Sequence, residues 1–203
     1  MHYKEEAKKL GYVYSELLNR NIVNKLKEEN RNLKQENKTL RKQATIDELT
    51  GLPNKALAFE ILKKEIFKSM REESNLSVSY FDINNFKNIN DKYGHHIGDK
   101  VIKYFGKEVE KRLRKVDTLS RLHGDEFLAI LPDAEEKAAY DVLRRITNIK
   151  PYENEIQLSA SYGVAQFNKS DYNKKPIENI IENLIKKADD KMYEHKKSKN
   201  TKN

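Results

Sequence analysis

The strongest constraint on the fold is an alternation of short apolar runs with amphipathic segments after residue 75. The strand-length apolar runs are residues 76–83, 117–122, 127–131 and 156–167. The segments with helical spacing of apolar residues are residues 96–115, 133–146 and 176–197. The order β-α-β-β-α-β predicts an α+β fold with a ferredoxin-like, palm-type core.

Local signals place the ends of these helices and add one helix before the core. Asp133 and Glu136 have the spacing of a capping box, so we expect a helix to begin at Asp133. Pro176 favours a helix start at that position. The turn "TGLPN" precedes a helical pattern that runs from Leu57 to Met70. The core therefore has flanking helices on both sides.

The first 44 residues carry a different pattern, a heptad repeat without proline. Leucines recur every seven residues at Leu26, Leu33 and Leu40. The complementary heptad position holds Val23, Asn30, Asn37 and Ala44. Leucine at d with asparagine at a is typical of a parallel, two-stranded coiled coil. A single solvated helix is the alternative, because three heptads are marginal. We favour a homodimer through residues 1–44, followed by one domain over residues 45–203.

Composition limits the partners and the compartment. The net charge of +8 favours anionic partners, but the lysines are scattered, which is typical of a lysine-rich surface and not of a nucleic-acid site. The absence of cysteine excludes disulfides and thiolate metal sites. The early apolar stretch "LGYVYSELL" is too short to span a membrane, and no signal peptide is visible. We therefore expect a cytoplasmic protein without a membrane span.

Carboxylates from two separate segments are predicted to meet. The stretch "RLHGDEFLAIL" is expected to form a hairpin with Asp125 and Glu126 at its turn. In the ferredoxin-like topology the first strand, which ends in Asp82, lies beside this hairpin. Two aspartates at close range repel each other, and a divalent cation such as Mg²⁺ or Mn²⁺ would relieve the repulsion. The plainer alternatives are an ordinary hairpin turn and an aspartate that only ends a strand.

The segment "DINNFKNIND", read here as a loop, adds groups suited to a nucleotide. Lys87 would neutralise a phosphate, and the backbone amides of Asn85 and Phe86 would donate hydrogen bonds to phosphate oxygens. Asn90 and Asp99 would accept hydrogen bonds from the donors of a guanine edge. Each of these signals is weak alone, and their ordered combination is the stronger argument.

Five segments together resemble the GGDEF domain, the diguanylate cyclase family. They are "DELTGLPNK", "FDINNFKNINDKYGHHIGD", "RKVDTLSRLHGDEF", "SASYGVA" and "ADDKMYEHKKSKN". The resemblance implies that two GTP molecules, one on each of two protomers, are joined into cyclic di-GMP with release of pyrophosphate. It also gives the coiled coil a purpose, because a tether raises the local concentration of the partner domain.

The resemblance assigns the metal site and its surroundings to five positions. Asp82 and Asp125 would bind the metal ions with help from the carbonyl of Ile83. Glu126 would assist the metal site or the attacking 3′-hydroxyl, and Gly124 would lie against the substrate.

The resemblance also assigns the nucleotide contacts. Asn90 and Asp99 would recognise guanine, whereas Lys87 and Lys196 would hold phosphates, with Lys87 serving catalysis directly. Lys199 is our candidate for a further phosphate contact, where the family usually has an arginine.

A second site is implied upstream of the hairpin. Arg114 and Asp117 form an Arg-x-x-Asp motif at the spacing of the family's inhibitory product site, and we expect Arg121 to join them. The alternative is a helix that ends in basic residues, which favour its C-terminal dipole.

Departures from the family pattern leave a second function open. His123 replaces the first glycine of the signature, and Asn84 replaces a frequent aspartate. The imidazole would either obstruct GTP or donate to a phosphate. The alternative function is a catalytically degenerate module that binds GTP or cyclic di-GMP and acts through protein contacts. A gain of turnover on His123→Gly would indicate that the chain is handicapped at this position.

Overall fold

The computed structural model describes residues 2–147, 149–153, 155–172 and 176–200. The chain divides into two compact units, residues 1–44 and residues 45–203.

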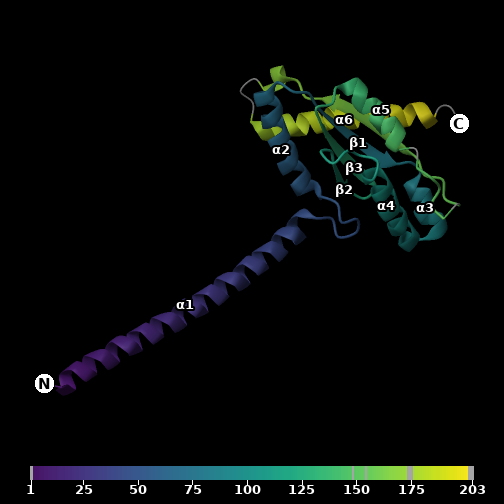
Figure 1. Ribbon diagram of the computed structural model, residues 1–203. Coiled ribbons are helices and arrows are strands. Elements are labelled where there is room, and N and C mark those ends of the chain that lie inside the picture. Colours follow the sequence, from purple (N-terminus) through teal and green to yellow (C-terminus); the bar gives the residue numbers. More distant parts are fainter. Residues whose placement is uncertain (1, 148, 154, 173–175, 201–203) are drawn as a thin grey trace. The chain divides into compact units, whose positions relative to one another are not determined.

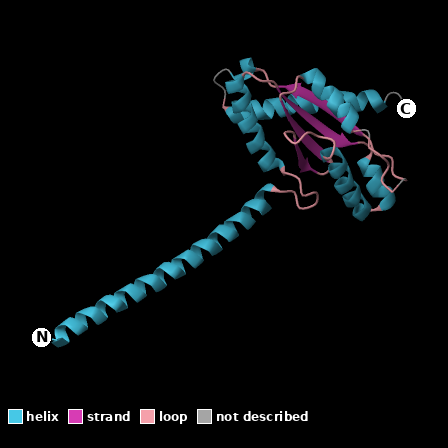
Figure 2. Cartoon of the chain, in the orientation of Figure 1, coloured by secondary structure: helices cyan, strands magenta, loops and turns pink. Residues whose placement is uncertain are grey.

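The first unit is one long helix, α1 (His2–Thr45), drawn without interruption in Figure 2. Its second half is rich in lysine, glutamate and leucine, which all have good helix propensity. The leucines of the heptad pattern stay more than half exposed: Leu26 at 57%, Leu33 at 52% and Leu40 at 55%. An exposed apolar stripe of this spacing is compatible with a coiled coil.

The second unit is built on one four-stranded antiparallel sheet (Figure 1). The strands are β1 (Leu76–Ile83), β2 (Thr118–His123), β3 (Glu126–Pro132) and β4 (Ala160–Gln166). Their order in the sheet is β2-β3-β1-β4, which confirms the ferredoxin-like arrangement. The predicted hairpin joins β2 to β3, and β3 lies beside β1 as expected.

Helices cover both faces of this sheet. One face packs against α3 (Phe86–Tyr93), α4 (His95–Glu110) and α5 (Glu136–Ile146). The other face packs against α2 (Lys55–Glu72) and α6 (Ile177–Asn200). Strand β1 shows why both layers form, because successive side chains point to opposite faces: Phe81 enters the first core and Tyr80 the second.

A glycine in β4 sets how closely α6 approaches the sheet. A Cβ atom on Gly163 would lie 2.2 Å from the Ala188 carbonyl oxygen and 2.2 Å from the Met192 nitrogen. Only glycine permits that contact between helix and strand backbones. The close packing brings the later turns of α6 toward the end of β1.

Several expected boundaries are wrong, each for a local reason. Residues 86–93 form α3 and not a loop, because Phe86 and Ile89 turn inward against the first core. Asp133 does not cap a helix; it adopts a left-handed turn at φ 55°, and α5 begins three residues later without a side-chain cap.

The remaining differences concern lengths. The helix predicted over 96–115 ends at Glu110, and the strand predicted over 156–167 begins only at Ala160. Ile156 instead pairs with Tyr152 in an isolated bridge. A short 3₁₀ turn (Lys169–Tyr172) lies between β4 and α6. Within the described residues, no helix has both the length and the apolar character that a membrane crossing requires.

Candidate active site

Three carboxylates meet where β1 ends beside the hairpin turn. Asp82 and Glu126 are direct cross-strand partners in the β1–β3 register. The amide of Ile83 donates to the carbonyl of Asp125 at 3.3 Å, which ties the turn to the end of β1. The topology therefore brings Asp82, Asp125 and Glu126 together, as expected from the sequence.

This cluster holds more negative charge than its one lysine balances. Lys196 of α6 pairs with Oδ2 of Asp82, whereas Oδ1 of Asp82 is buried without a hydrogen-bond partner. Burial raises the pKa of Asp82, and the charge of Glu126 adds to this in spite of Lys196. Burial also raises the pKa of Asp125, with a further contribution from Asp82. Raised pKa values are expected where buried carboxylates crowd together.

Glu126 is held from two sides. The Tyr80 hydroxyl on β1 donates to Oε2 of Glu126, and Nε2 of His123 on β2 lies 2.9 Å from the same oxygen. Asp189 of α6 lies near this group, and its pKa is raised by burial and by the charge of Glu126.

A cleft of about 470 Å³ opens beside the carboxylates. Its lining residues are Ile83, Asn85, Phe86, Lys87, Asn88, Asn90, Asp91, His95, Asp125 and Lys196. The volume falls within the range of small-molecule sites, roughly 300–1,000 Å³. His123 is not among these residues and lines a separate cavity.

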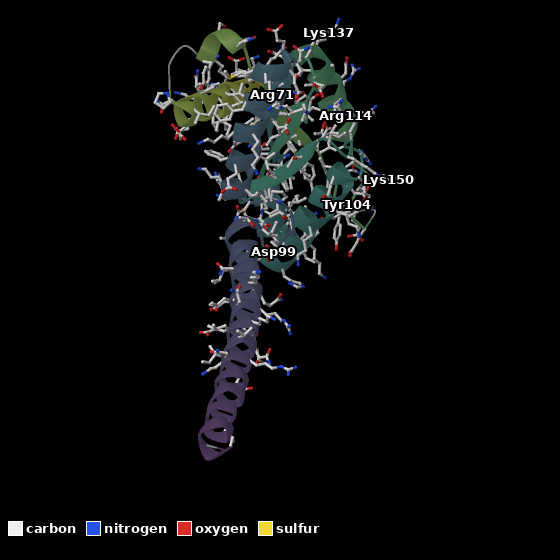
Figure 3. The ribbon with its side chains drawn as sticks, turned by 60° about the vertical axis from the view of Figure 1, so that its left-hand side comes forward. Arg71, Asp99, Tyr104, Arg114, Lys137 and Lys150 are labelled. Atoms are coloured by element: carbon white, nitrogen blue, oxygen red, sulfur yellow. The ribbon has the colours of Figure 1, made fainter. Side chains whose placement is uncertain are left out.

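An acceptor without a donor lies in this cleft. Oδ1 of Asn90 is buried and has no hydrogen-bond partner among the described residues. A Cβ atom on Gly98 would lie 1.9 Å from that oxygen, so the amide of Asn90 fits only because α4 has a glycine there. Asp99 is the next residue of α4 and is exposed, outside the cleft lining (Figure 3).

The entrance to α3 supplies backbone donors. Asn85 adopts a left-handed conformation at φ 57° and precedes the first turn of α3, which begins at Phe86. The first amides of a helix lack intrahelical acceptors and favour anions. Asn84, by contrast, is engaged with β4 and the residues before it, because it donates to Ser159 at 2.8 Å and accepts from Ser161 at 2.7 Å.

The donor set suits a cation that the substrate helps to bind. Within the described part of the chain, no group of three or more histidines or acids is arranged to hold a metal ion by itself. Mg²⁺ is usually held by one or two carboxylates together with substrate phosphates. Asp82, whose buried Oδ1 lacks a partner, and Asp125 meet that description, with the Ile83 carbonyl nearby.

The Arg-x-x-Asp motif lies beyond the end of α4, apart from Asp99 near the start of that helix (Figure 3). Arg114 pairs with Asp117 at 2.7 Å and donates to the Pro132 carbonyl at 2.9 Å. The hydrogen bond to Asp117 raises the pKa of Arg114.

Arg121 does not join this pair. Its Nη1 lies 3.0 Å from Oδ1 of Asp47, and its Nε donates to the Gly124 carbonyl at 2.8 Å. Burial opposes the charged form of Asp47, but hydrogen bonds from Thr50 and Arg121 outweigh it and lower the pKa of Asp47. Arg121 therefore fastens the hairpin turn to the segment before α2. The Lys199 side chain lies outside the described residues.

The site residues that were not identified from the sequence include Tyr80, Gly98, Asp47 and Asp189. Two of them carried a usable signal. Tyr80 is two residues before Asp82 on the same strand face, and Asp189 is seven residues before Lys196 on the same helix face. Gly98 and Asp47 gave no such signal, because their contacts depend on the tertiary fold.

The family model for "Diguanylate cyclase, GGDEF domain" matches residues 44–202. Among curated proteins, diguanylate cyclase DgcS of Shewanella oneidensis is 33% identical over 159 residues, covering 77% of this chain and 51% of DgcS. Diguanylate cyclase DgcP of Pseudomonas aeruginosa is 42% identical over 106 residues, covering 52% of this chain and 16% of DgcP. The chain thus spans about half of DgcS and a smaller part of DgcP.

Solved structures show the same architecture. The coiled coil and GGDEF domain of DgcB from Caulobacter crescentus, in complex with c-di-GMP, matches with a TM-score of 0.74 at 22% identity, over 89% of this chain and 95% of that one. Diguanylate cyclase SiaD of Pseudomonas aeruginosa, in complex with its activator SiaC, matches with a TM-score of 0.67 at 27% identity, over 96% of this chain and 75% of that one.

Proposed function

The chain belongs to the diguanylate cyclase GGDEF-domain family, and from this premise we propose that it condenses two molecules of GTP into cyclic di-GMP. The observation that carries the proposal is a pair of buried acceptors: Oδ1 of Asn90 in the cleft, and Oδ1 of Asp82 next to the cleft residue Ile83. A buried polar atom without a partner costs free energy, about 1–3 kcal/mol. A cation at Asp82 and a guanine edge at Asn90 would remove both costs.

The reaction is a double phosphoryl transfer. The 3′-hydroxyl of each GTP attacks the α-phosphorus of the other, so two P–O3′ bonds form. Two bonds to the leaving pyrophosphates break, and each hydroxyl loses its proton. Divalent cations, when bound, stabilise the attacking and leaving oxygens of such a displacement.

The residues of this chain would bind and orient the substrate. Asp82 and Asp125 would hold the cations, with Glu126 beside the attacking hydroxyl. Lys87 and Lys196 line the cleft and would pair with phosphates. The amides at Asn85 and Phe86 would donate to phosphate oxygens at the start of α3.

Guanine would be recognised by side-chain hydrogen-bond acceptors. A guanine edge carries two adjacent donors, N1–H and N2–H₂, and Asn90 offers it a buried acceptor. Asp99 lies one turn into α4 and would supply the second acceptor. Adenine presents one donor and one acceptor at the equivalent edge, so it would leave one of these oxygens without a partner.

Each protomer would hold one GTP, so two chains must meet. The exposed leucine stripe of α1 supplies a means of dimerisation, in which two copies pair as a parallel coiled coil. Tethering two domains in this way converts an encounter between molecules into an intramolecular one. We further propose that Arg114 and Asp117 bind cyclic di-GMP, and that the bound product inhibits the enzyme.

Product analysis tests the proposal. Purified chain is incubated with GTP and Mg²⁺ or Mn²⁺, and the nucleotides are separated by chromatography, with ATP as the control substrate. We expect cyclic di-GMP and pyrophosphate from GTP, no cyclic product from ATP, and no product with Asp82→Ala. Tight GTP binding without cyclic di-GMP would instead support a binding module.

A further inference from the structure

We propose that Tyr80 and His123 are positioning residues that hold Glu126 in the orientation its catalytic role requires. The inference rests on the proposed function of the site. Both side chains address the same oxygen, Oε2: the Tyr80 hydroxyl donates to it, and Nε2 of His123 lies 2.9 Å away. The other oxygen, Oε1, is then left to face a metal ion or a substrate hydroxyl.

The strand register explains why these two residues reach Glu126. Glu126 is the cross-strand partner of Asp82 on one side and of His123 on the other. Tyr80 lies two residues before Asp82 and therefore points to the same face of the sheet. One donor thus comes from each strand next to β3, and the carboxylate is held from both sides.

Tyr80 is suited to act as a permanent donor. Its side chain is part of the core, and the residue is only 7% exposed. Burial and the hydrogen bond to Glu126 both raise the pKa of Tyr80, so the phenol keeps its proton at physiological pH. A fixed donor at this point keeps Oε2 in place although Asp82 and Asp189 repel the carboxylate.

His123 lies on the same sheet face as Glu126 and Tyr80. It lines a separate cavity of about 340 Å³ between α2, β2 and α6, together with Phe59, Leu122 and Ile185. It does not contribute to the cleft that contains Asn90 and Lys87. The imidazole is therefore assigned as a support for Glu126, and turnover should fall in His123→Gly.

The magnitude follows from known behaviour of ligating carboxylates. Hydrogen bonds to a metal-binding side chain fix its orientation, and their removal typically costs about 10–100-fold in activity or metal affinity. We expect a loss of about tenfold from either His123→Gly or Tyr80→Phe. His123→Gln, which keeps a donor at the place of Nε2, should recover most of that loss.

The kinetic test compares these variants with matched controls. Tyr162→Phe removes a phenolic hydroxyl from strand β4, and His96→Ala removes an exposed histidine from α4. For His123→Gly and Tyr80→Phe we expect kcat to fall about tenfold while KM for GTP changes less than twofold. The controls should match the wild type in kcat. Thermal unfolding of every variant checks that the fold is kept.

A second readout does not depend on turnover. Mn²⁺ binding is measured by electron paramagnetic resonance in the presence of a non-hydrolysable GTP analogue. A loss of Mn²⁺ affinity or of kcat in both test variants, recovered by His123→Gln, supports the inference. Unchanged values in both readouts, a gain in turnover with His123→Gly, or no Mn²⁺ binding by the wild type would overturn it. If the wild type binds Mn²⁺ but forms no cyclic di-GMP, the proposed function fails while the Mn²⁺ comparison still decides this inference.

Discussion

Helix α1 and the domain over residues 45–203 differ in which side-chain groups remain unsatisfied. On α1, apolar side chains remain in water, and Leu26 and Leu40 are more than half exposed. In the domain, polar atoms remain buried without donors, at Asp82 and Asn90. Exposed apolar stripes call for an apolar partner, whereas buried acceptors call for cations and N–H groups. In our proposal, a second copy of the chain completes the helix and the substrate completes the domain.

In the domain, the largest effect is expected from Asp125→Asn, which changes a carboxylate next to Asp82. In our proposal Asp125 binds a cation, so the loss of its carboxylate should lower the rate of cyclic di-GMP formation by about 10³-fold, because cations supply several kcal/mol to such reactions. The same change should raise the Tm of the nucleotide-free protein by a few degrees, since it removes a charge from a crowded, buried site. Calorimetry and product analysis on one sample check both effects.

The gain in stability from Asp125→Asn should depend on pH. The pKa of Asp125 is raised above its ordinary value of 3.8 in the folded protein. A raised value contributes stability that is fully present below pH 4 and is lost as the pH rises through the folded pKa. Asp125→Asn does not lose stability in this way. The Tm of the variant should therefore exceed that of the wild type by a small amount near pH 4 and by a larger amount at pH 7. A difference in Tm that becomes smaller as the pH rises would contradict the raised pKa of Asp125.

The exposed stripe is tested by Leu33→Lys. A charge at this heptad position should separate the two helices and lower turnover at dilute protein concentration by about a hundredfold, because the tether is lost. Gln35→Lys introduces the same side chain on the outer side of α1 and is the control. Analytical ultracentrifugation should find a monomer for Leu33→Lys and a dimer for the wild type and Gln35→Lys. A dimer of Leu33→Lys would refute the role of the leucine stripe.

A smaller effect is expected at the floor of the cleft. Gly98→Ala should displace the amide of Asn90 and weaken GTP binding by about tenfold. Gly106→Ala changes the same helix α4, and its added Cβ atom meets the flexible Leu52 side chain at 3.2 Å. Isothermal titration should find GTP affinity unchanged in this control. Equal affinity in both variants would show that Gly98 does not shape the site.

The smallest effect concerns the Arg114–Asp117 pair. Arg114→Ala removes the guanidinium and should raise the cyclic di-GMP concentration needed for half inhibition by about fivefold. Initial rates measured with added cyclic di-GMP check this expectation. If inhibition is unchanged, the pair only fastens the loop after α4 to the Pro132 carbonyl.

The sequence predicts the sheet well because its strands carry strong, separate apolar runs, and Asp82 meets the hairpin because topology alone determines it. It fails at α3, whose eight residues are mostly polar and read as a loop. It also fails at Asp133, where the capping spacing is present but the chain needs a left-handed turn after β3.

Within the site, roles set by chain neighbours were predictable, and roles set by tertiary contacts were not. The cleft residues around Lys87 follow from one short motif. The pairing of Arg121 with Asp47, and the position of Asn90 against Gly98, depend on segments that only the fold brings together. His123 could be recognised as unusual, but its direction toward Glu126 required the strand register.

The most direct test of the account is the rate of cyclic di-GMP formation from GTP and Mg²⁺, measured per molecule of protein over a wide range of protein concentrations. If the leucine stripe and the acceptors at Asp82 and Asn90 are completed as argued, the specific rate rises with protein concentration and levels off once the dimer forms. Bound GTP without cyclic di-GMP at any protein concentration would contradict the account.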